Sequence, residues 1–238
     1  MKSGLWTQTL GRLLPRLCLL CESPCASAPL CPPCTAFLPG SRRRRCDTCA
    51  RPWHTSNCCA TCRLTPPAYD ASCAAADYCA PLDRAVTSLK FSAQIGLASG
   101  LGALLADAWL RSGPGLGPVH CIVPVPLSRA RLAQRGFNQA GLIAASMVRS
   151  LRGQRALPAL RPSLLARHRD TRPQSLLSWQ ARQANLDHGF VAAAGLEGLC
   201  IGVVDDVMTT GATLQAAALA LKAAGAARVV NLVVARTA

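Results

Sequence analysis

The sequence predicts an α/β protein with a mainly parallel, twisted sheet flanked by helices and preceded by a small cysteine-rich domain. Short apolar runs alternate with helical patterns from residue 68 onward. Twelve of the fourteen cysteines lie before residue 80, and many form C-x-x-C pairs. Pro66-Pro67 separates the two kinds of composition. We therefore place a cysteine-rich domain at residues 1–65 and an α/β domain at residues 66–238.

Apolar periodicity divides the second region into elements. Helices are expected over 95–110 and 138–148, where apolar residues recur at helical spacing. Buried strands are expected over 119–125, 200–204 and 228–234, and a short strand pair over 69–78. Because right-handed crossovers bring the carboxyl ends of parallel strands to one edge, the loops after these strands should meet there.

The most informative segment is residues 201–213, which read IGVVDDVMTTGAT. An apolar strand runs into Asp205 and Asp206, and a small polar loop then leads into a helix expected over 214–224. Free N–H groups at a helix start suit a phosphate, and Gly211 lets the backbone approach it. The carboxylates can accept hydrogen bonds from sugar hydroxyls. Together these features predict a pocket for a ribose 5-phosphate. The alternative is a strand that ends in a solvated Asp-Asp turn and caps an ordinary helix, in which case the hydroxyl-rich loop would be accidental.

This segment resembles the phosphoribosyl-pyrophosphate (PRPP) signature of type I phosphoribosyltransferases. The resemblance implies that fold and a Mg²⁺-dependent displacement at the anomeric carbon, in which pyrophosphate leaves. It makes Asp205 and Asp206 the candidate catalytic residues, which would hold the ribose hydroxyls. Mg²⁺ would be held by Asp206 or by the donor itself. The residues expected to bind PRPP in this segment are Val207, Met208, Thr209, Thr210, Gly211, Ala212 and Thr213.

A second loop, over 124–129, follows the predicted strand at 119–125 and is placed to meet the pyrophosphate. Basic side chains and backbone N–H groups suit a diphosphate. Ser128, Arg129 and Arg135 are therefore expected to neutralise it. The alternative is a plain strand-to-helix connection whose arginines face solvent.

Four C-x-x-C pairs predict structural zinc: Cys18/Cys21, Cys31/Cys34, Cys46/Cys49 and Cys59/Cys62. Two such knuckles complete a tetrahedral Zn(Cys)₄ site, so eight thiolates would hold two zinc ions, or one if only half of them coordinate. Either neighbouring or alternate pairs could share a metal, and Cys58 could replace Cys59. Four evenly separated pairs argue against a disulfide framework. Since the region has few apolar residues, metal would supply its folding free energy.

The formal net charge of +15 favours a polyanionic partner, either nucleic acid or a phosphorylated small molecule. The run Arg42–Arg45 either grips phosphates or forms an exposed charged loop. Arginine outnumbers lysine 23 to 3, a bias that coding composition alone could produce. We find neither the roughly 18–20 apolar residues of a transmembrane helix nor a continuous apolar signal segment, and so expect a cytoplasmic location.

A narrower resemblance covers nearly the whole chain. The C-x-x-C pairs, the V-P-V-P-L loop, the box Arg135-Gly136-Phe137-Asn138-Gln139 and the V-V-D-D-V-x-T-T-G-x-T segment are together similar to the ComF family, which includes ComFC and GntX-type proteins. Residues 167–190 also resemble that family's pattern. In type I phosphoribosyltransferases this region forms a mobile hood, from which Arg169 is expected to reach PRPP.

The ComF resemblance implies PRPP handling, an N-terminal zinc finger and, in competence proteins, the entry of transforming single-stranded DNA into the cytoplasm. We therefore expect a PRPP-dependent transferase with an unassigned acceptor and a role in DNA uptake, working with the competence machinery. One alternative is a non-catalytic module that handles single-stranded DNA on a degenerate transferase fold. The other is a purely structural adaptor.

Overall fold

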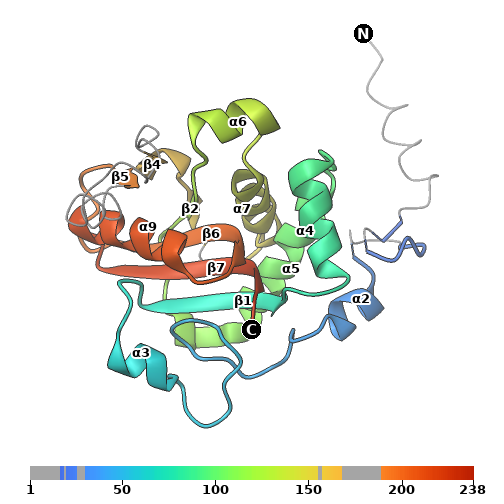
Figure 1. The fold of residues 1–238 in the computed structure, drawn as a ribbon, viewed down its shortest axis with the longest axis horizontal. Coiled ribbons are helices and arrows are strands. Elements are labelled where there is room, and N and C mark those ends of the chain that lie inside the picture. The colour runs from blue at the N-terminus through green and yellow to red at the C-terminus, as the bar shows by residue number, and fades with distance from the viewer. Residues whose placement is uncertain (1–16, 19, 26–29, 155–156, 168–188) are drawn as a thin grey trace, which may run out of the picture.

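The computed structural model describes residues 17, 18, 20–25, 30–154, 157–167 and 189–238 (Figure 1). It confirms the predicted α/β class, because five strands form one parallel sheet in the order β1-β7-β6-β2-β3. These strands are β1 (Ala71–Asp77), β2 (Cys121–Pro124), β3 (Ala159–Leu160), β6 (Cys200–Met208) and β7 (Arg228–Arg236). Two further strands, β4 (Leu165–Arg167) and β5 (Phe190–Ala192), form a separate antiparallel pair.

Helices cover both faces of the sheet (Figure 1). One face carries α4 (Leu82–Phe91), α5 (Leu97–Ser112) and α7 (Gln139–Ser150), and the other carries α9 (Ala212–Ala223). The shorter elements are α2 (Pro32–Phe37), α3 (Ala60–Leu64), α6 (Arg129–Arg135) and the 3₁₀ turns η1 (Gly113–Leu116) and η2 (Pro162–Leu164). Because both faces are covered, the central strands β6 and β7 are apolar along most of their length.

The helices α5 and α7 pack closely at Gly102. A Cβ at this position would lie 2.7 Å from the Ile143 carbonyl oxygen and 2.7 Å from the Met147 nitrogen. Such distances are shorter than van der Waals contact, so a side chain here would force the two helices apart. The glycine thus sets the spacing of the helix layer on which one face of the sheet rests.

Most predicted elements match the structure within a few residues, and three points differ. The strand pair expected over 69–78 is wrong: this stretch holds the single strand β1, paired in parallel with β7. The strand expected over 200–204 continues to Met208, so both aspartates lie within β6. Several elements were not predicted, namely α4 and the shorter α2, α3, α6, β3, β4 and β5.

The cysteine-rich segment wraps around the β1 edge of the sheet. The backbone N–H groups of Ser72 and Asp77 donate to the carbonyls of Asp47 and Pro39, each at 2.8 Å. Arg45 also donates to the Asp77 carboxylate at 2.7 Å. The edge strand β1 therefore finds hydrogen-bond partners in this segment.

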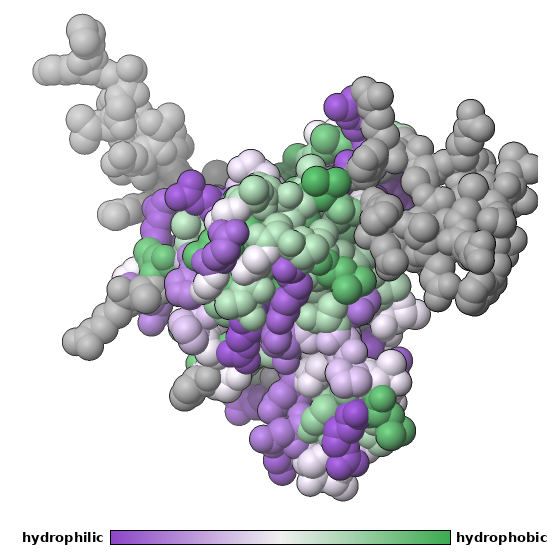
Figure 2. All heavy atoms as spheres, turned by 90° about the vertical axis from the view of Figure 1, so that its left-hand side faces the viewer, coloured by the Kyte–Doolittle hydropathy of each residue, from purple (hydrophilic) through white to green (hydrophobic). Residues whose placement is uncertain are grey.

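The side of the molecule that carries α9 and α3 is seen in Figure 2. Apolar residues gather over the upper centre of that view, and hydrophilic residues predominate below them. None of the helices in the described ranges is both long enough and apolar enough to cross a membrane.

Candidate functional site

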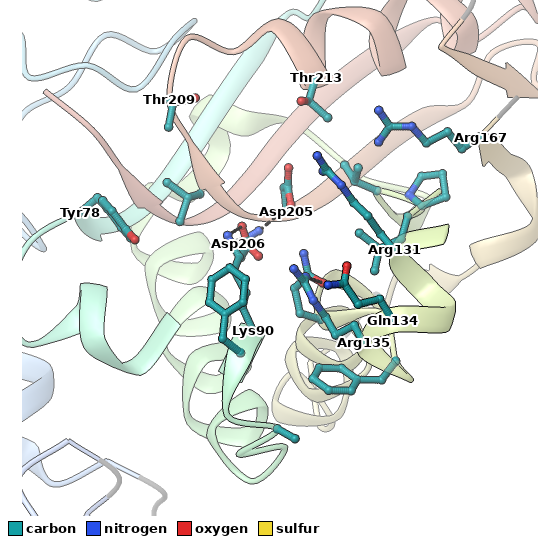
Figure 3. A pocket seen from close by; sticks show the side chains of 18 residues that line it. Tyr78, Lys90, Arg131, Gln134, Arg135, Arg167, Asp205, Asp206, Thr209 and Thr213 are labelled. Carbon is teal, nitrogen blue, oxygen red and sulfur yellow. Dashed lines mark hydrogen bonds and ion pairs between the residues drawn. The ribbon is translucent and has the colours of Figure 1, made fainter. Parts of the chain in front are cut away.

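A pocket of about 920 Å³ lies at the carboxyl edge of the sheet (Figure 3). Tyr78 lines it just after β1, Val125 to Leu127 line it after β2, and the end of β6 and the next residue contribute Asp205, Asp206, Val207 and Thr209. The α4 helix adds Lys90, while α6 adds Arg131 and Arg135. Strands from three places in the sequence thus deliver polar groups to one edge, as expected for a parallel α/β sheet.

The two aspartates share a single nearby lysine. Asp206 is 3% exposed, and its Oδ1 accepts from the Lys90 ammonium at 2.8 Å. Its Oδ2 is buried and has no hydrogen-bond partner among the described residues. Asp205 accepts from the backbone N–H of Asp206 at 2.9 Å. Burial and the neighbouring Asp206 carboxylate raise the pKa of Asp205 to about 7.

This arrangement leaves acceptor capacity in the pocket. The unpartnered Asp206 oxygen calls for a donor or a cation, because a buried polar atom without a partner is costly. One lysine for two carboxylates leaves the pair under-neutralised. Sugar hydroxyls and a hard divalent cation are both ligands that would satisfy it.

The loop after β6 turns sharply into the start of α9. Gly211 has a φ of +86°, the left-handed region that glycine adopts without strain. A Cβ at Gly211 would lie 2.9 Å from the Met208 methyl group and 3.2 Å from the Tyr69 hydroxyl. At the Gly211 end of α9 the Ala212 N–H donates to the Thr210 hydroxyl, while the N–H groups of Thr213 and Leu214 make no described hydrogen bond and remain available to an anion.

Not all residues of the predicted PRPP segment reach the pocket. Val207, Thr209 and Thr213 line it, Met208 is buried, and Thr210 and Ala212 are exposed outside its lining. The Thr210 hydroxyl accepts from the Ala212 N–H at 3.3 Å. The segment therefore divides into residues that face the cavity and residues that shape the turn.

Three arginines form the basic wall of the pocket: Arg131, Arg135 and Arg167. Arg135 also donates to the Gln139 side chain and lies over the Phe91 ring, 5.5 Å from its centroid. Neither Ser128 nor Arg129 is among the described residues that line the pocket. Ser128 instead caps α6, accepting from the Arg131 N–H at 3.3 Å, and Arg129 is exposed.

Lys90, Arg131 and Arg167 line the pocket but were not assigned to it from the sequence, although Arg131 belongs to the basic run that follows the 124–129 loop. The signal for Lys90 was present, because Leu82, Val86 and Leu89 have helical spacing and place a lysine in the last turn of α4. Because α6 begins at Arg129, Arg131 and Arg135 are four residues apart in one helix and lie on the same face of it. The prediction for Arg135 could therefore have been extended to Arg131. Arg167 depends on the β4–β5 pair, which no sequence pattern indicated.

The cysteines form two separate groups, Cys18/Cys21/Cys31/Cys34 and Cys46/Cys49/Cys59/Cys62. Neighbouring pairs therefore share a site, and Cys59 rather than Cys58 belongs to the second group. Within each group the four sulfur atoms lie within 4.8 Å of one another. All fourteen cysteines of the chain are free of disulfide bonds.

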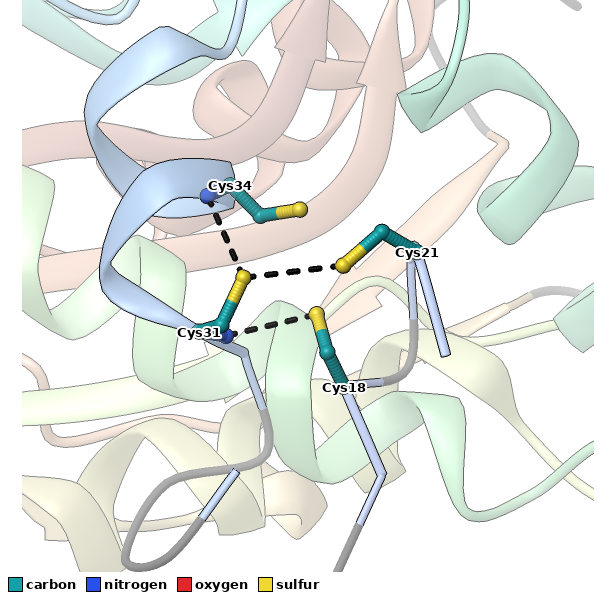
Figure 4. A group of neighbouring side chains, drawn as sticks. All are labelled: Cys18, Cys21, Cys31 and Cys34. Atoms are coloured by element: carbon teal, nitrogen blue, oxygen red, sulfur yellow. Dashed lines mark hydrogen bonds between the residues drawn. The ribbon is translucent and has the colours of Figure 1, made fainter. Parts of the chain in front are cut away.

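Their geometry fits tetrahedral zinc (Figure 4). With Zn–S bonds of about 2.3 Å, the sulfurs of a tetrahedron lie about 3.8 Å apart. The Sγ atoms of Cys21 and Cys31 are 3.6 Å apart, and those of Cys49 and Cys59 are 3.8 Å apart. Each group could hold one structural zinc ion, and four sulfur ligands would leave no open coordination position.

Backbone N–H groups point at these sulfurs, as they do in metal-binding knuckles. The N–H of Cys31 donates to Cys18 Sγ at 3.3 Å, and the N–H of Cys59 donates to Cys46 Sγ at 3.2 Å. Burial opposes ionisation of Cys46, but the N–H groups around it outweigh burial and lower its pKa to about 7. Hydrogen bonds from Ser23 lower the pKa of Cys21 to about 6. These effects favour the thiolate, the form that binds metal, at Cys21 and Cys46, whereas burial raises the pKa of Cys34 and Cys62.

No family model matches the chain. It is 34% identical over 221 residues to the DNA utilization protein YhgH of Escherichia coli (strain K12), covering 91% of this chain and 95% of that protein. The same values hold for the YhgH protein of Salmonella typhimurium. Identity to Competence protein F of Haemophilus influenzae is 31% over 162 residues, 66% of this chain and 69% of that protein. The chain belongs to the ComF family.

In this ComF-family protein, the segment similar to the hood falls largely outside the described residues. Arg169, Thr171, Gln174, Leu177, Arg182 and Asn185 all lie there, so the expectation for Arg169 stays a prediction. At its two ends, Arg167 pairs with Phe190 in the β4–β5 ladder. The Arg167 guanidinium lies over the Phe190 ring, 5.3 Å from the centroid, which places it beside the pocket.

Proposed function

We propose that this ComF-family chain binds PRPP with Mg²⁺ and transfers the phosphoribosyl group to an acceptor, releasing pyrophosphate. The observation that carries the proposal is the single pocket that joins the Asp205–Asp206 pair, the start of α9 and a wall of three arginines. Each of these features suits one part of PRPP. An arrangement of this kind positions charge along a sugar that carries phosphate at both ends.

The 5-phosphate would sit at the start of α9, held by backbone N–H groups and by Thr209 and Thr213. The ribose hydroxyls would donate to the carboxylates of Asp205 and Asp206. The pyrophosphate would face Arg131, Arg135 and Arg167 on the opposite wall. Arg131 and Arg167 thereby take the place expected for Ser128 and Arg129.

When bound, Mg²⁺ supplies neutralising charge to the pyrophosphate. The unpartnered oxygen of Asp206 and the under-neutralised acid pair are consistent with a nearby cation. The chain's own residues orient the donor: the loop fixes one end, the arginines hold the leaving group, and the carboxylates face the ribose ring. Negative charge beside that ring stabilises the positive charge that develops as the glycosidic bond breaks.

The test is calorimetric titration of PRPP in the presence of Mg²⁺. At pH 8, above the pKa of Asp205, the variant Asp205→Asn/Asp206→Asn is expected to lose binding by at least about 100-fold, because two charged acceptors are replaced by groups that also donate. The control Asp107→Asn changes an acid on α5 that pairs with Arg111 away from the pocket, and its affinity should match wild type. Equal affinity in the double variant would refute the proposed site. Pyrophosphate release in an acceptor screen would then establish transfer.

A second candidate function is the handling of single-stranded DNA. Two relatives bear names that refer to DNA utilization and competence. A second cavity of about 510 Å³ lies between the cysteine-rich segment and the sheet, and Arg42, Arg43 and Arg111 are among its lining residues. All three are exposed, as suits contacts to a phosphate backbone. Arg43 pairs with Asp77 at 3.1 Å but keeps 46% of its side chain exposed. Arg45 is different, because only 10% of its side chain is exposed and its guanidinium donates to the Gly40 and Ala50 carbonyls as well as to Asp77.

Binding of a fluorescent oligonucleotide across a salt series tests this candidate. Replacing Arg42, Arg43 and Arg111 by alanine should weaken binding and reduce the slope of log K against log salt by about 2, given about 0.7 per phosphate contact. The matched control replaces the exposed arginines Arg84, Arg149 and Arg152, with the same change in net charge. Equal losses in both variants would indicate a response to net charge alone.

A further inference from the structure

Arg236 is a fully buried cation at the end of β7, with 1% of its surface exposed. It takes part in none of the ion pairs found in the described ranges. Its side chain donates instead to backbone carbonyls, with the Thr237 hydroxyl as an additional acceptor. A charge in such a place is tolerated only when its hydrogen bonds are satisfied, so these carbonyls must stay where they are.

The carbonyls that Arg236 holds belong to two distant parts of the sequence. Its Nε donates to the Cys49 carbonyl at 3.0 Å, inside the Cys46-x-x-Cys49 knuckle. Its Nη1 donates to the Met208 carbonyl at 2.9 Å and also to the Thr209 carbonyl. A single guanidinium therefore connects the second cysteine group to the loop that precedes Gly211.

Tyr69 makes a second connection between the same two places. It is 6% exposed and packs in the apolar cluster that contains Cys46, Cys49, Cys59 and Cys62. Its hydroxyl lies 3.2 Å from the position a Cβ would take on Gly211. Met208 belongs to the same cluster. The turn of the loop thus rests on side chains that are themselves packed against the cysteines.

The first cysteine group differs in this respect. Cys18 and Cys31 pack in the other apolar cluster, with α4 and α5. The described contacts of Arg236 include none of the four cysteines of this group. The first cysteine group is therefore an internal control for the second: its cysteines have the same spacing, but the described contacts do not link it to the loop.

We propose that metal at the second cysteine group sets the conformation of residues 209–213 through Arg236, which acts as a positioning residue for the phosphate loop. The part that concerns PRPP affinity rests on the proposed function. Coupling between two binding sites is reciprocal, so PRPP should also slow zinc loss from the second group and not from the first.

The experiment compares two matched double variants, Cys59→Ser/Cys62→Ser and Cys31→Ser/Cys34→Ser. Hydrogen–deuterium exchange is measured without ligand in a peptide that spans residues 209–217, in which the Gln215 N–H donates to the Gly211 carbonyl at 2.8 Å and so reports on the conformation of the loop. Disrupting the second group should speed exchange in this loop about 10-fold or more, whereas disrupting the first should leave it within about 2-fold of wild type. Zinc release to a chelator is then followed with and without PRPP. PRPP should slow release only in the variant that retains the second group.

Equal effects of the two variants on the loop, or no effect of either, would overturn the proposal. If the Cys59→Ser/Cys62→Ser variant also exchanges faster in α7, which is far from the second cysteine group, its effect is general unfolding. The variants Arg236→Gln and Arg236→Lys are then used in its place. Arg236→Gln should raise loop exchange while zinc content stays at the wild-type level, and Arg236→Lys should recover part of the protection by keeping the charge. Unchanged loop exchange in Arg236→Gln would overturn the role of this residue. A loop that responds only to the second group, in a protein that does not bind PRPP, would sustain the coupling and reject the proposed function.

Discussion

The two walls of the pocket are built in different ways. The β6 wall is held by buried groups. Asp206 is 3% exposed and pairs with Lys90, and buried Arg236 donates to the Met208 carbonyl just before the loop that leads to Gly211. In the basic wall, Arg131 and Arg135 stand on α6, a helix of seven residues with no buried side chain, and Arg167 stands on β4. The first wall is fixed by buried packing, whereas the second is held by α6 and by the contacts of Arg135 with Phe91 and of Arg167 with Phe190. Changes in the first should therefore affect both fold and binding, and changes in the second should affect binding alone.

The sharpest test of this contrast is a pair of glycine substitutions. Gly211→Ala should lower the free energy of unfolding by about 3 kcal/mol, because strain at positive φ adds to the clash with Met208 and Tyr69. Gly136→Ala, at the end of α6, has a similar φ of +79° but meets nothing within 4 Å. It should cost about 1 kcal/mol, from strain alone. Urea unfolding measures both, and equal losses would contradict the difference between the walls.

The raised pKa of Asp205 predicts a pH-dependent cost in the β6 wall. Between its ordinary pKa of 3.8 and about 7, the folded protein keeps a proton that the unfolded chain releases. Stability from this group is present below about pH 4 and is lost as pH rises toward 7. Relative to Asp205→Asn, wild type should lose up to about 2.7 kcal/mol between pH 5 and pH 8. Parallel pH profiles for the two proteins, measured by urea unfolding, would exclude the shift.

Lys90 should stabilise the fold through Asp206. Lys90→Met removes the cation 2.8 Å from a carboxylate that is 3% exposed, and should cost about 2 kcal/mol at pH 8. Adding Asp206→Asn removes the orphaned charge and should restore part of this loss. The coupling energy from the double-mutant cycle is the measurement. Additive effects would mean that the ion pair contributes nothing.

The smallest expected effect lies on the basic wall. Arg131→Ala should weaken Mg²⁺-PRPP binding about 10-fold, or about 1.4 kcal/mol, by removing one charged donor to the pyrophosphate. Arg129→Ala, on the same helix but outside the pocket lining, should change affinity by less than about 2-fold. Both variants should unfold like wild type. A larger loss from Arg129 than from Arg131 would restore the original expectation for the 124–129 loop.

The sequence predicted those parts of the molecule that depend on local pattern. The apolar runs of β6 and β7 and the residues from Asp205 to Thr213 are continuous in the chain, so their order alone indicates a strand, an acid pair and a turn into a helix. The binding of an anion by that turn stays a prediction. The meeting of neighbouring knuckles, rather than alternate ones, could not be predicted. Spacing brings two thiolates to one turn, whereas the path of the chain between turns decides which knuckles meet.

The missed residues depend on contacts between distant segments. Lys90 reaches Asp206 only because α4 packs beside the carboxyl end of β6, and the pair is separated by more than 100 residues. Arg236 follows the apolar run of β7 and is next to Thr237, so nothing in the local sequence distinguishes it from an exposed arginine. Its burial follows from the cysteine knuckle that covers it, which no periodicity in β7 reveals.

The cover that the cysteine-rich segment places over β1 has a practical consequence. A strand at the rim of a sheet offers its unpaired amides to any extended chain, and here Asp47 and Pro39 occupy the amides of Ser72 and Asp77. If each cysteine group holds zinc as its geometry allows, removing that zinc with a chelator would release the cover and expose the unpaired amides of β1 on molecules whose sheet is still folded. Preparations made without zinc should therefore self-associate, and light scattering before and after chelation would detect it.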